Sequence, residues 1–347
     1  MNTQLQKESV AELPEGFTTR GAHVDDVEST MVLFNRWSRS VVGRDEFTVA
    51  SALRNEWMSP GFDPATDIRL VIAPNNQIVG LIEVWTNSKP LVHPWMSGCV
   101  DPDYENLGIA TWLLHWAEQR ALQELPNLLA ELRFAPRLGV FREAEKSRKL
   151  FEDLGYGRIR SSYHMQIEMD EPVSAPEFPE GIILRTYQPG IDAEAVYRAQ
   201  TDSFRDHFGF VEEPFEDGLD HFKHFWEQPG FDPSLLFLAI DGPSREIAGI
   251  SLCPSHSIDD PELGWVSTLG VCRPWRKRGI GLALLRHSFN EFYRRGMRKV
   301  GLGVDAENLT GALRLYENAG MHVQQVFDMY EKELRPGAEI SVENLSK

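Results

Sequence analysis

The sequence predicts two tandem domains of the α/β (α+β) class, each a mixed, mostly antiparallel sheet flanked by helices. Three observations predict this fold. The 347 residues are enough for two domains of ordinary size. With 42% hydrophobic and 25% charged residues, the chain has the composition of a globular protein. Its second half repeats features of the first, and short apolar runs alternate with segments of helical length.

The repeat consists of short matches that recur in the same order, which is typical of a duplicated domain. They pair residues 13–20 with 178–185, 60–64 with 229–233, 78–80 with 247–249, 108–110 with 279–281, and 150–155 with 315–320. A polar, Pro-rich stretch over 171–180 separates the copies and predicts a linker. We therefore predict an N-terminal domain over 1–170, a C-terminal domain over 181–335 and a tail over 336–347.

The second copy gives the clearest pattern of secondary structure. Its apolar runs predict strands over residues 182–186, 235–240, 246–252, 265–271, 299–304 and 322–333. The longer segments between them predict helices over residues 193–207, 215–227, 282–295 and 311–319. This order of elements favours one mixed sheet per domain, with helices against it.

Charge and cysteine content exclude several classes of protein. The 52 acidic and 35 basic side chains give a net charge of −17, shared between both halves, so we expect no nucleic-acid partner and favour cationic ones. Neither a membrane span nor the pattern of a signal peptide is visible, so we expect a cytoplasmic protein with no membrane partner. The three cysteines form no CxxC pair and the ten histidines no HExxH motif, so we expect no metal.

The segment over 271–285 carries the strongest chemical signal. It passes from a predicted strand through a basic turn into a helix that begins near Gly279 and Gly281. Free N–H groups at a helix start, beside the positive end of its dipole, form an anion site suited to a pyrophosphate. A solvated basic turn is the alternative. A dinucleotide fingerprint fits less well, because Leu284 stands where a third small residue is needed.

Two motifs in this domain resemble a known family. The run Arg276-x-x-Gly279-x-Gly281, after a strand ending in Leu269-Gly270-Val271, resembles the acyl-CoA pyrophosphate loop of the GNAT superfamily of N-acetyltransferases. Residues 304–321, which include Asn308 and Tyr316, resemble its second cofactor motif. The resemblance covers residues 181–334 well and 16–169 more loosely. The tandem arrangement with an intact second copy resembles the two-domain type, as in mycothiol synthase.

This resemblance implies roles in binding acetyl-CoA and transferring its acetyl group. The pyrophosphate would be bound by the loop residues Arg276, Lys277, Arg278, Gly279, Ile280, Gly281 and Leu282. The backbone of Leu269, Gly270 and Val271 would pair with the pantetheine and polarise the thioester carbonyl. Asn308 would bind the pantetheine arm, with a helix cap as its alternative role. Tyr316 would be the general acid for the leaving thiolate, or else a core aromatic residue.

The general base is the least defined residue of the predicted site. In similar enzymes a carboxylate often lies four residues before the Leu-Gly-Val triplet, but here that residue is Trp265. Glu262 is the nearest acid and is our candidate for the base. His207, after the first predicted helix of the domain, is a second candidate on the substrate side.

The N-terminal copy lacks these chemical groups. Phe151 lies at the place of Tyr316, Glu105 at the place of Arg276, and Glu143 near that of Asn308. We therefore expect a degenerate N-terminal domain and a catalytic C-terminal one. The resemblance implies transfer of an acetyl group to a primary amine of a small substrate in a ternary complex, and the acidic net charge favours a cationic one. The alternatives are a non-catalytic acyl-CoA-binding regulator and an acetyltransferase of a protein amine. The oligomeric state, monomer or homodimer, stays open.

Overall fold

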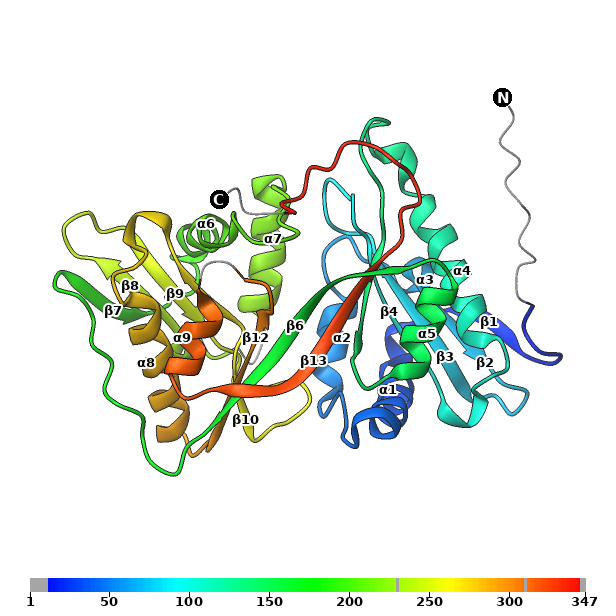
Figure 1. Ribbon diagram of the computed structural model, residues 1–347, viewed down its shortest axis with the longest axis horizontal. Helices are drawn as coiled ribbons and strands as arrows, with labels where there is room; N and C mark the ends of the chain where they lie inside the picture. Colours follow the sequence, from blue (N-terminus) through cyan, green and yellow to red (C-terminus); the bar gives the residue numbers. More distant parts are fainter. Residues whose placement is uncertain (1–11, 229–230, 309–310, 344–347) are drawn as a thin grey trace. The chain divides into compact units, whose positions relative to one another are not determined.

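The computed structural model describes residues 12–228, 231–308 and 311–343 (Figure 1). The repeat residues Pro229 and Gly230 and the start of the chain, residues 1–11, lie outside the described residues. The chain divides into two compact units, which are described separately. Unit 1 holds the chain up to Arg158 together with Tyr330–Glu339. Unit 2 holds Ile159–Met329 and the residues from Ile340 onward.

Unit 1 is built on a sheet with the strand order β1-β2-β3-β4-β5. The strands are β1 (Thr18–Gly21), β2 (Ile68–Ile72), β3 (Ile78–Trp85), β4 (Trp95–Val100) and β5 (Arg137–Phe141). All pairs are antiparallel except β4 with β5. The helices are α1 (Val27–Val42), α2 (Ala50–Trp57), α3 (Pro64–Asp67), α4 (Ile109–Leu122) and α5 (Glu145–Asp153). Helix α4 packs against one face of the sheet, where Gly80 of β3 has no side chain and lies close to Ile109 and Leu113. On the opposite face, the indole N–H of Trp57 on α2 donates a hydrogen bond to Glu83 of β3.

Unit 2 contains two groups of strands. The first is an antiparallel sheet in the order β11-β9-β8-β7, made of β7 (Ile182–Thr186), β8 (Leu236–Asp241), β9 (Ile247–Leu252) and β11 (Thr268–Val271). The second has the order β13-β6-β12-β10, made of β6 (Gly157–Glu168), β10 (Leu263–Val266), β12 (Lys299–Asp305) and β13 (His322–Glu331). Strand β12 is antiparallel to β6 and parallel to β10. The helices are α6 (Ala193–Phe204), α7 (Phe215–Trp226), α8 (Ile280–Arg294) and α9 (Ala312–Asn318).

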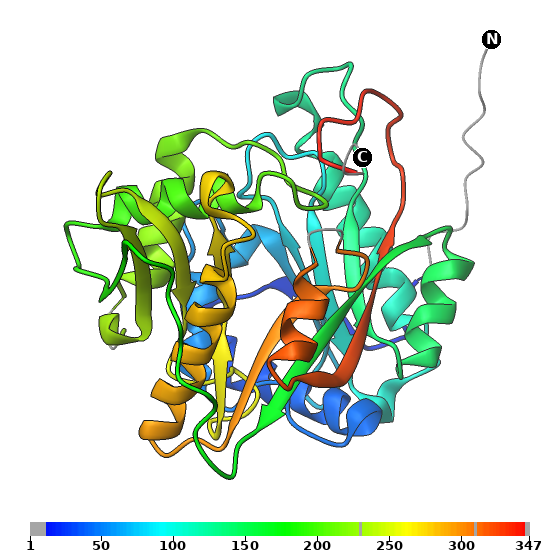
Figure 2. The same cartoon turned by 60° about the vertical axis from the view of Figure 1, so that its left-hand side comes forward.

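The sheet β11-β9-β8-β7 is covered by helices on both faces. Alternate residues of a strand point to opposite faces, so Leu238 and Ile250 join a core with α6 and α7. Phe237 and Ala248 join the other core, with α8 and α9. Helices α8 and α9 lie side by side in both views (Figure 1 and Figure 2), and Leu315 approaches the start of α8. The predicted fold class is confirmed by these mixed, mostly antiparallel sheets with helices.

Two features differ from the linear pattern of the sequence. The predicted strand over 265–271 is two strands, because the chain changes its pairing partner from β12 to β9 at Ser267. Strand β6 is the last strand of the first sequence repeat, but it pairs with β12 in unit 2. Residues 330–339 come at the end of the second sequence repeat, but they belong to unit 1. The boundaries at 171–180 and 335 therefore stay predictions about the sequence repeats. Among the described helices, none combines the length and apolarity that crossing a membrane requires.

Candidate active site

A cavity of about 520 Å³ lies in unit 2, between elements that both predicted cofactor motifs supply. Its walls come from β11, the loop that follows it, the start of α8, the end of β12, α9 and the end of α6. The predicted residues that line it are Leu269, Gly270, Val271, Arg276, Lys277, Gly279, Ile280, Gly281, Leu282, Asn308 and Tyr316. Arg278 and Glu262 are not among the lining residues. The fold thus brings the two motifs together around one space.

Strand β11 presents a backbone edge to this cavity, because it is the edge strand of its sheet. The amide of Cys272 donates to the carbonyl of Ala248 over 3.0 Å. In an antiparallel ladder, hydrogen-bonded pairs alternate with pairs whose polar groups point away. Leu269 and Val271 therefore direct their backbone groups to the free edge. Such an edge can bind an extended chain of amides as an added strand.

The loop after β11 ends in a helix start that has no side-chain cap. Lys277 has φ 62° and Gly279 has φ 86°, so both adopt the left-handed conformation that turns the chain into α8. For a lysine this conformation costs on the order of 1 kcal/mol, which is typical of functional sites. The first-turn residues Ile280, Gly281 and Leu282 line the cavity. N–H groups at such a helix start, beside the positive end of the helix dipole, can bind an anion, and their contact with a pyrophosphate stays a prediction.

Arg276 has structural partners in addition to its place on the cavity wall. Its Nη1 lies 2.6 Å from Oδ2 of Asp206, and its Nη2 donates to the carbonyl of Ser203 over 3.0 Å. Its Nε donates to the carbonyl of Val271 over 3.2 Å. The guanidinium holds the pKa of Asp206 below its ordinary value. Arg276 therefore ties the loop to the end of α6, whereas Lys277 and Arg278 are exposed cations of the same loop.

Tyr316 and Asn308 also line this cavity. Tyr316 is 7% exposed on α9, and its ring packs in the core with α8 while the residue also lines the cavity. Burial raises the pKa of Tyr316 to about 12, so the phenol stays protonated at neutral pH. Asn308 follows β12, and its amide donates to the carbonyl of Asp305 over 3.1 Å. Gly311 is the N-cap of α9, so Asn308 does not cap that helix.

The candidate bases lie in different surroundings. Glu262 is exposed in the loop before β10, and its amide donates to Oδ1 of Asp260 over 2.8 Å. Trp265 packs its ring over Gly301 and beside the ring of His164, with ring centroids 5.2 Å apart. His207 lines the cavity itself. From the sequence, His207 was the second candidate for the general base after Glu262, because chain position alone does not show which loop lines the cavity.

Unit 1 keeps the shape of the cofactor loop without its charges. Asn106 has φ 61° and Gly108 has φ 78°, close to the angles of their counterparts Lys277 and Gly279. Glu105, at the place of Arg276, forms an ion pair with Lys146. Phe151, at the place of Tyr316, packs edge-on against Tyr330 with ring centroids 5.5 Å apart. This loop therefore has the backbone of an anion site but presents a paired carboxylate.

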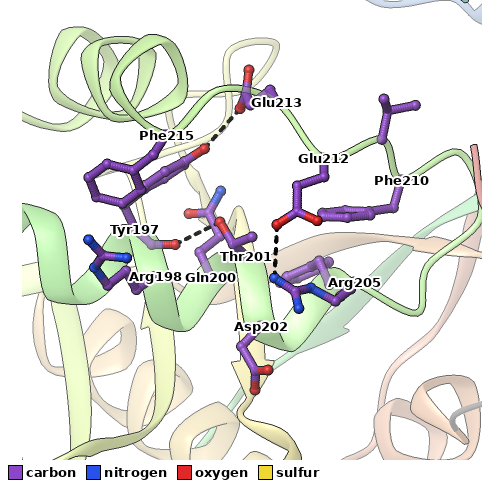
Figure 3. A pocket seen from close by; sticks show the side chains of 12 residues that line it. Tyr197, Arg198, Gln200, Thr201, Asp202, Arg205, Phe210, Glu212, Glu213 and Phe215 are labelled. Carbon is purple, nitrogen blue, oxygen red and sulfur yellow. Dashed lines mark hydrogen bonds and ion pairs between the residues drawn. The ribbon is translucent and has the colours of Figure 1, made fainter. Parts of the chain in front are cut away.

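A second cavity of unit 2, of about 430 Å³, lies along α6 (Figure 3). Figure 3 shows Glu212 and Glu213 above the helix, on the segment that also carries Phe210. The hydroxyl of Tyr197 donates to Glu213 over 3.1 Å, and Arg205 pairs with Glu212 over 3.2 Å. Phe204 lines both this cavity and the one beside Tyr316. A space lined by aromatic rings and by charges of both signs therefore borders the candidate active site.

Comparisons with known proteins agree with this geometry. A model of the acetyltransferase (GNAT) family matches residues 32–156 and 193–321, together well over half of the chain. Mycothiol acetyltransferase of Thermobispora bispora is 32% identical over 200 residues, which cover 56% of this chain and 65% of that relative. Mycothiol acetyltransferase of Thermobifida fusca is 27% identical over 247 residues, which cover 66% and 74%. The match thus spans less than two thirds of the first relative.

Two solved structures resemble the whole chain. A GCN5-related N-acetyltransferase from Sphaerobacter thermophilus has a TM-score of 0.78 and 32% identity, and the match covers 96% of this chain and 100% of that one. A tandem GNAT protein from the clavulanic acid biosynthesis pathway has a TM-score of 0.70 and 15% identity, and the match covers 93% and 100%. The second likeness shows the fold alone.

Proposed function

Because the chain belongs to the GNAT acetyltransferase family, we propose that it transfers the acetyl group of acetyl-CoA to an amine. One observation carries the proposal. The free edge of β11, the uncapped start of α8 and Tyr316 meet in a single cavity. These three features match the parts of an acyl-CoA. The strand edge can pair with the pantetheine, the helix start can bind the pyrophosphate, and the tyrosine can donate a proton to the sulfur.

Different residues of unit 2 would bind the cofactor, stabilise the oxyanion and protonate the leaving thiolate. The amides at the start of α8, with Lys277 and Arg278, bind the pyrophosphate. A backbone amide of β11 stabilises the oxyanion that forms when the amine attacks the thioester, an effect worth about 3 kcal/mol. The C–N bond forms and the C–S bond breaks in one ternary complex. Tyr316 gives its proton to the leaving thiolate, which suits a phenol that burial keeps protonated.

We propose a small, cationic amine as acceptor. The net charge of −17 favours cationic partners by long-range steering. The cavity that borders the active site across Phe204 is lined by the carboxylates of Asp202, Glu212 and Glu213 and by the cations Arg198 and Arg205, an excess of one negative charge. The relatives are named for mycothiol, but Trp265 occupies the place where the family resemblance predicts a carboxylate. The acceptor panel should therefore include the mycothiol precursor among other amines.

The test is acetyl-CoA turnover over that panel, with Tyr316→Phe as the variant and Tyr293→Phe as its matched control. Tyr293 lies on α8 and donates its hydroxyl to the carbonyl of Asp170 over 3.0 Å, and it does not line the cavity. We expect Tyr316→Phe to lower kcat by about 10²- to 10⁴-fold, with CoA affinity unchanged. Binding of CoA without turnover of any amine would favour a regulatory acyl-CoA-binding protein. Turnover of protein amines alone would favour a macromolecular acceptor.

A further inference from the structure

We propose that His207 is the general base that takes the proton of the attacking amine. This inference rests on the proposed function and adds the residue that the family motifs do not supply here. Trp265 has no proton-accepting group in the place where a carboxylate is expected, and Glu262 is exposed outside the cavity lining. The base must therefore come from another wall of the cavity.

The titratable groups on the described cavity wall leave few choices. They are His207, Asp305, Tyr316, Lys277 and Arg276. Asp305 accepts two hydrogen bonds from Arg160, at 2.8 and 2.7 Å, so its carboxylate is held in an ion pair. Tyr316 is protonated at neutral pH, and the remaining two are cations. His207 is the group on this wall that can accept a proton near neutral pH.

The chain holds His207 in a defined place just after α6. Its amide donates to the carbonyl of Phe204 over 2.9 Å, and its carbonyl accepts from the amide of Phe210 over 3.1 Å. Its imidazole packs against the ring of Phe204, with centroids 4.5 Å apart. Both rings line the cavity. A base fixed in this way keeps its ring against the space that the acceptor must enter, which lowers the entropy cost of proton transfer.

The charges around His207 favour its neutral form. Burial lowers the pKa of His207 below its ordinary value, and the guanidinium of Arg276 acts in the same direction. The carboxylates of Asp305, at the end of β12, and Asp206, in the same loop, act in the opposite direction but with smaller effect. A neutral imidazole is therefore present at pH 7, ready to accept a proton.

The proposed step balances in protons and electrons. The acceptor ammonium first loses one proton to water, and the neutral amine nitrogen then bonds to the carbonyl carbon while His207 accepts its second proton. The C–S bond then breaks, and Tyr316 donates its proton to the thiolate. After product release, the imidazolium and the phenolate return to their starting forms by proton exchange through water. Acetyl-CoA and the amine are the only reactants that the step needs.

The experiment compares His207→Gln with Glu262→Gln and with His256→Gln, a matched control in the loop before β10. Each is assayed for the pH dependence of kcat/KM, for CoA affinity and for thermal unfolding. We expect His207→Gln to lower kcat at least 100-fold and to keep CoA affinity within twofold, whereas His207→Ala, which leaves room for a free imidazole, should regain activity when imidazole is added. The acid limb of the profile, with its inflection below pH 6.5, should disappear in the His207 variants alone.

Three results would overturn the inference. His207→Gln could keep the wild-type rate and acid limb, or it could lose only CoA affinity, which would make His207 a cofactor-binding residue. Loss of activity in Glu262→Gln, with His207→Gln unaffected, would return the role to the loop before β10. In each case Tyr316→Phe still tests the proposed function separately. If His207→Gln unfolds early, His207→Ala with imidazole rescue provides the same comparison.

Discussion

Arg276 provides a sharp test of what the cofactor loop needs in order to keep its shape. The family resemblance implies a pyrophosphate contact for this residue, but its guanidinium already bonds to Asp206, Ser203 and Val271. We expect Arg276→Ala to destabilise unit 2. The change removes three hydrogen bonds made by a charged group and leaves Asp206 without this partner.

The magnitude follows from these bonds and their burial. The side chains of Arg276 and Asp206 are 29% and 27% exposed, so solvent screens the pair only in part. Hydrogen bonds of charged groups contribute about 1.5 to 3 kcal/mol each when well buried, and partial exposure reduces the sum here to about 2 to 3 kcal/mol. For a unit of this size, that loss lowers Tm by roughly 4 to 12 °C.

The assay is calorimetric unfolding together with CoA titration at two salt concentrations. Arg278→Ala is the matched control, because Arg278 is exposed in the same loop. We expect Arg278→Ala to keep Tm but to weaken CoA binding, most strongly at low salt. If Arg276→Ala unfolds within 1 °C of the wild type while it loses CoA affinity, the guanidinium serves the ligand and our reasoning about the loop is wrong.

Two further predictions concern unit 1. Because Glu105 is paired with Lys146 in a loop of unchanged backbone, we expect calorimetric titration to give about one CoA per chain, and a second site of similar affinity would contradict this. Glu83 accepts a hydrogen bond from Trp57 over 2.7 Å, and burial raises its pKa to about 7. The folded chain therefore keeps a proton that the unfolded chain releases above its ordinary pKa, so this group makes stability fall as pH rises from about 4.5 to 7. The variant Glu83→Gln keeps the oxygen that accepts from Trp57, and it should raise the free energy of unfolding above that of the wild type by up to about 3 kcal/mol at pH 8 but not at pH 4.5. Urea unfolding at the two pH values measures this difference. An equal effect at both pH values would contradict the prediction.

The sequence predicted local structure well because periodicity and turn residues are local properties. The helices of the second repeat lie within a few residues of their predicted bounds, and the loop enters α8 at the predicted Gly279. The family resemblance is confirmed over both repeats. Alternation of apolar residues shows that a strand is buried but not which strand it pairs with. The break at Ser267 and the place of β6 beside β12 could therefore not be predicted.

In the candidate site, contacts between side chains that are distant in the sequence could likewise not be predicted. The motif residues Leu269, Gly270 and Val271 form the edge strand β11 and line the cavity. The partner of Arg276 is 70 positions away in the sequence, at Asp206, so only the fold could reveal that ion pair. His207 reaches the cavity because α6 ends at Phe204, earlier than its predicted bound. The polar pair Ser267 and Thr268, between the apolar residues Val266 and Leu269, was the available signal for the strand break.

The two copies of the cofactor loop separate what folding requires from what chemistry requires. Both copies turn from a strand into a helix through a left-handed residue followed by a left-handed glycine, at Asn106 and Gly108 and at Lys277 and Gly279. In each copy the left-handed glycine is the N-cap of the helix that follows, α4 or α8, so this backbone geometry starts the helix in both units. The side chains differ between the copies, because Glu105 pairs with Lys146, whereas Arg276, at the same place in the second copy, ties its loop to Asp206. The glycines of such a loop therefore indicate the fold, whereas our proposal that the second copy acts on acetyl-CoA rests on the exposed cations Lys277 and Arg278 and on Tyr316.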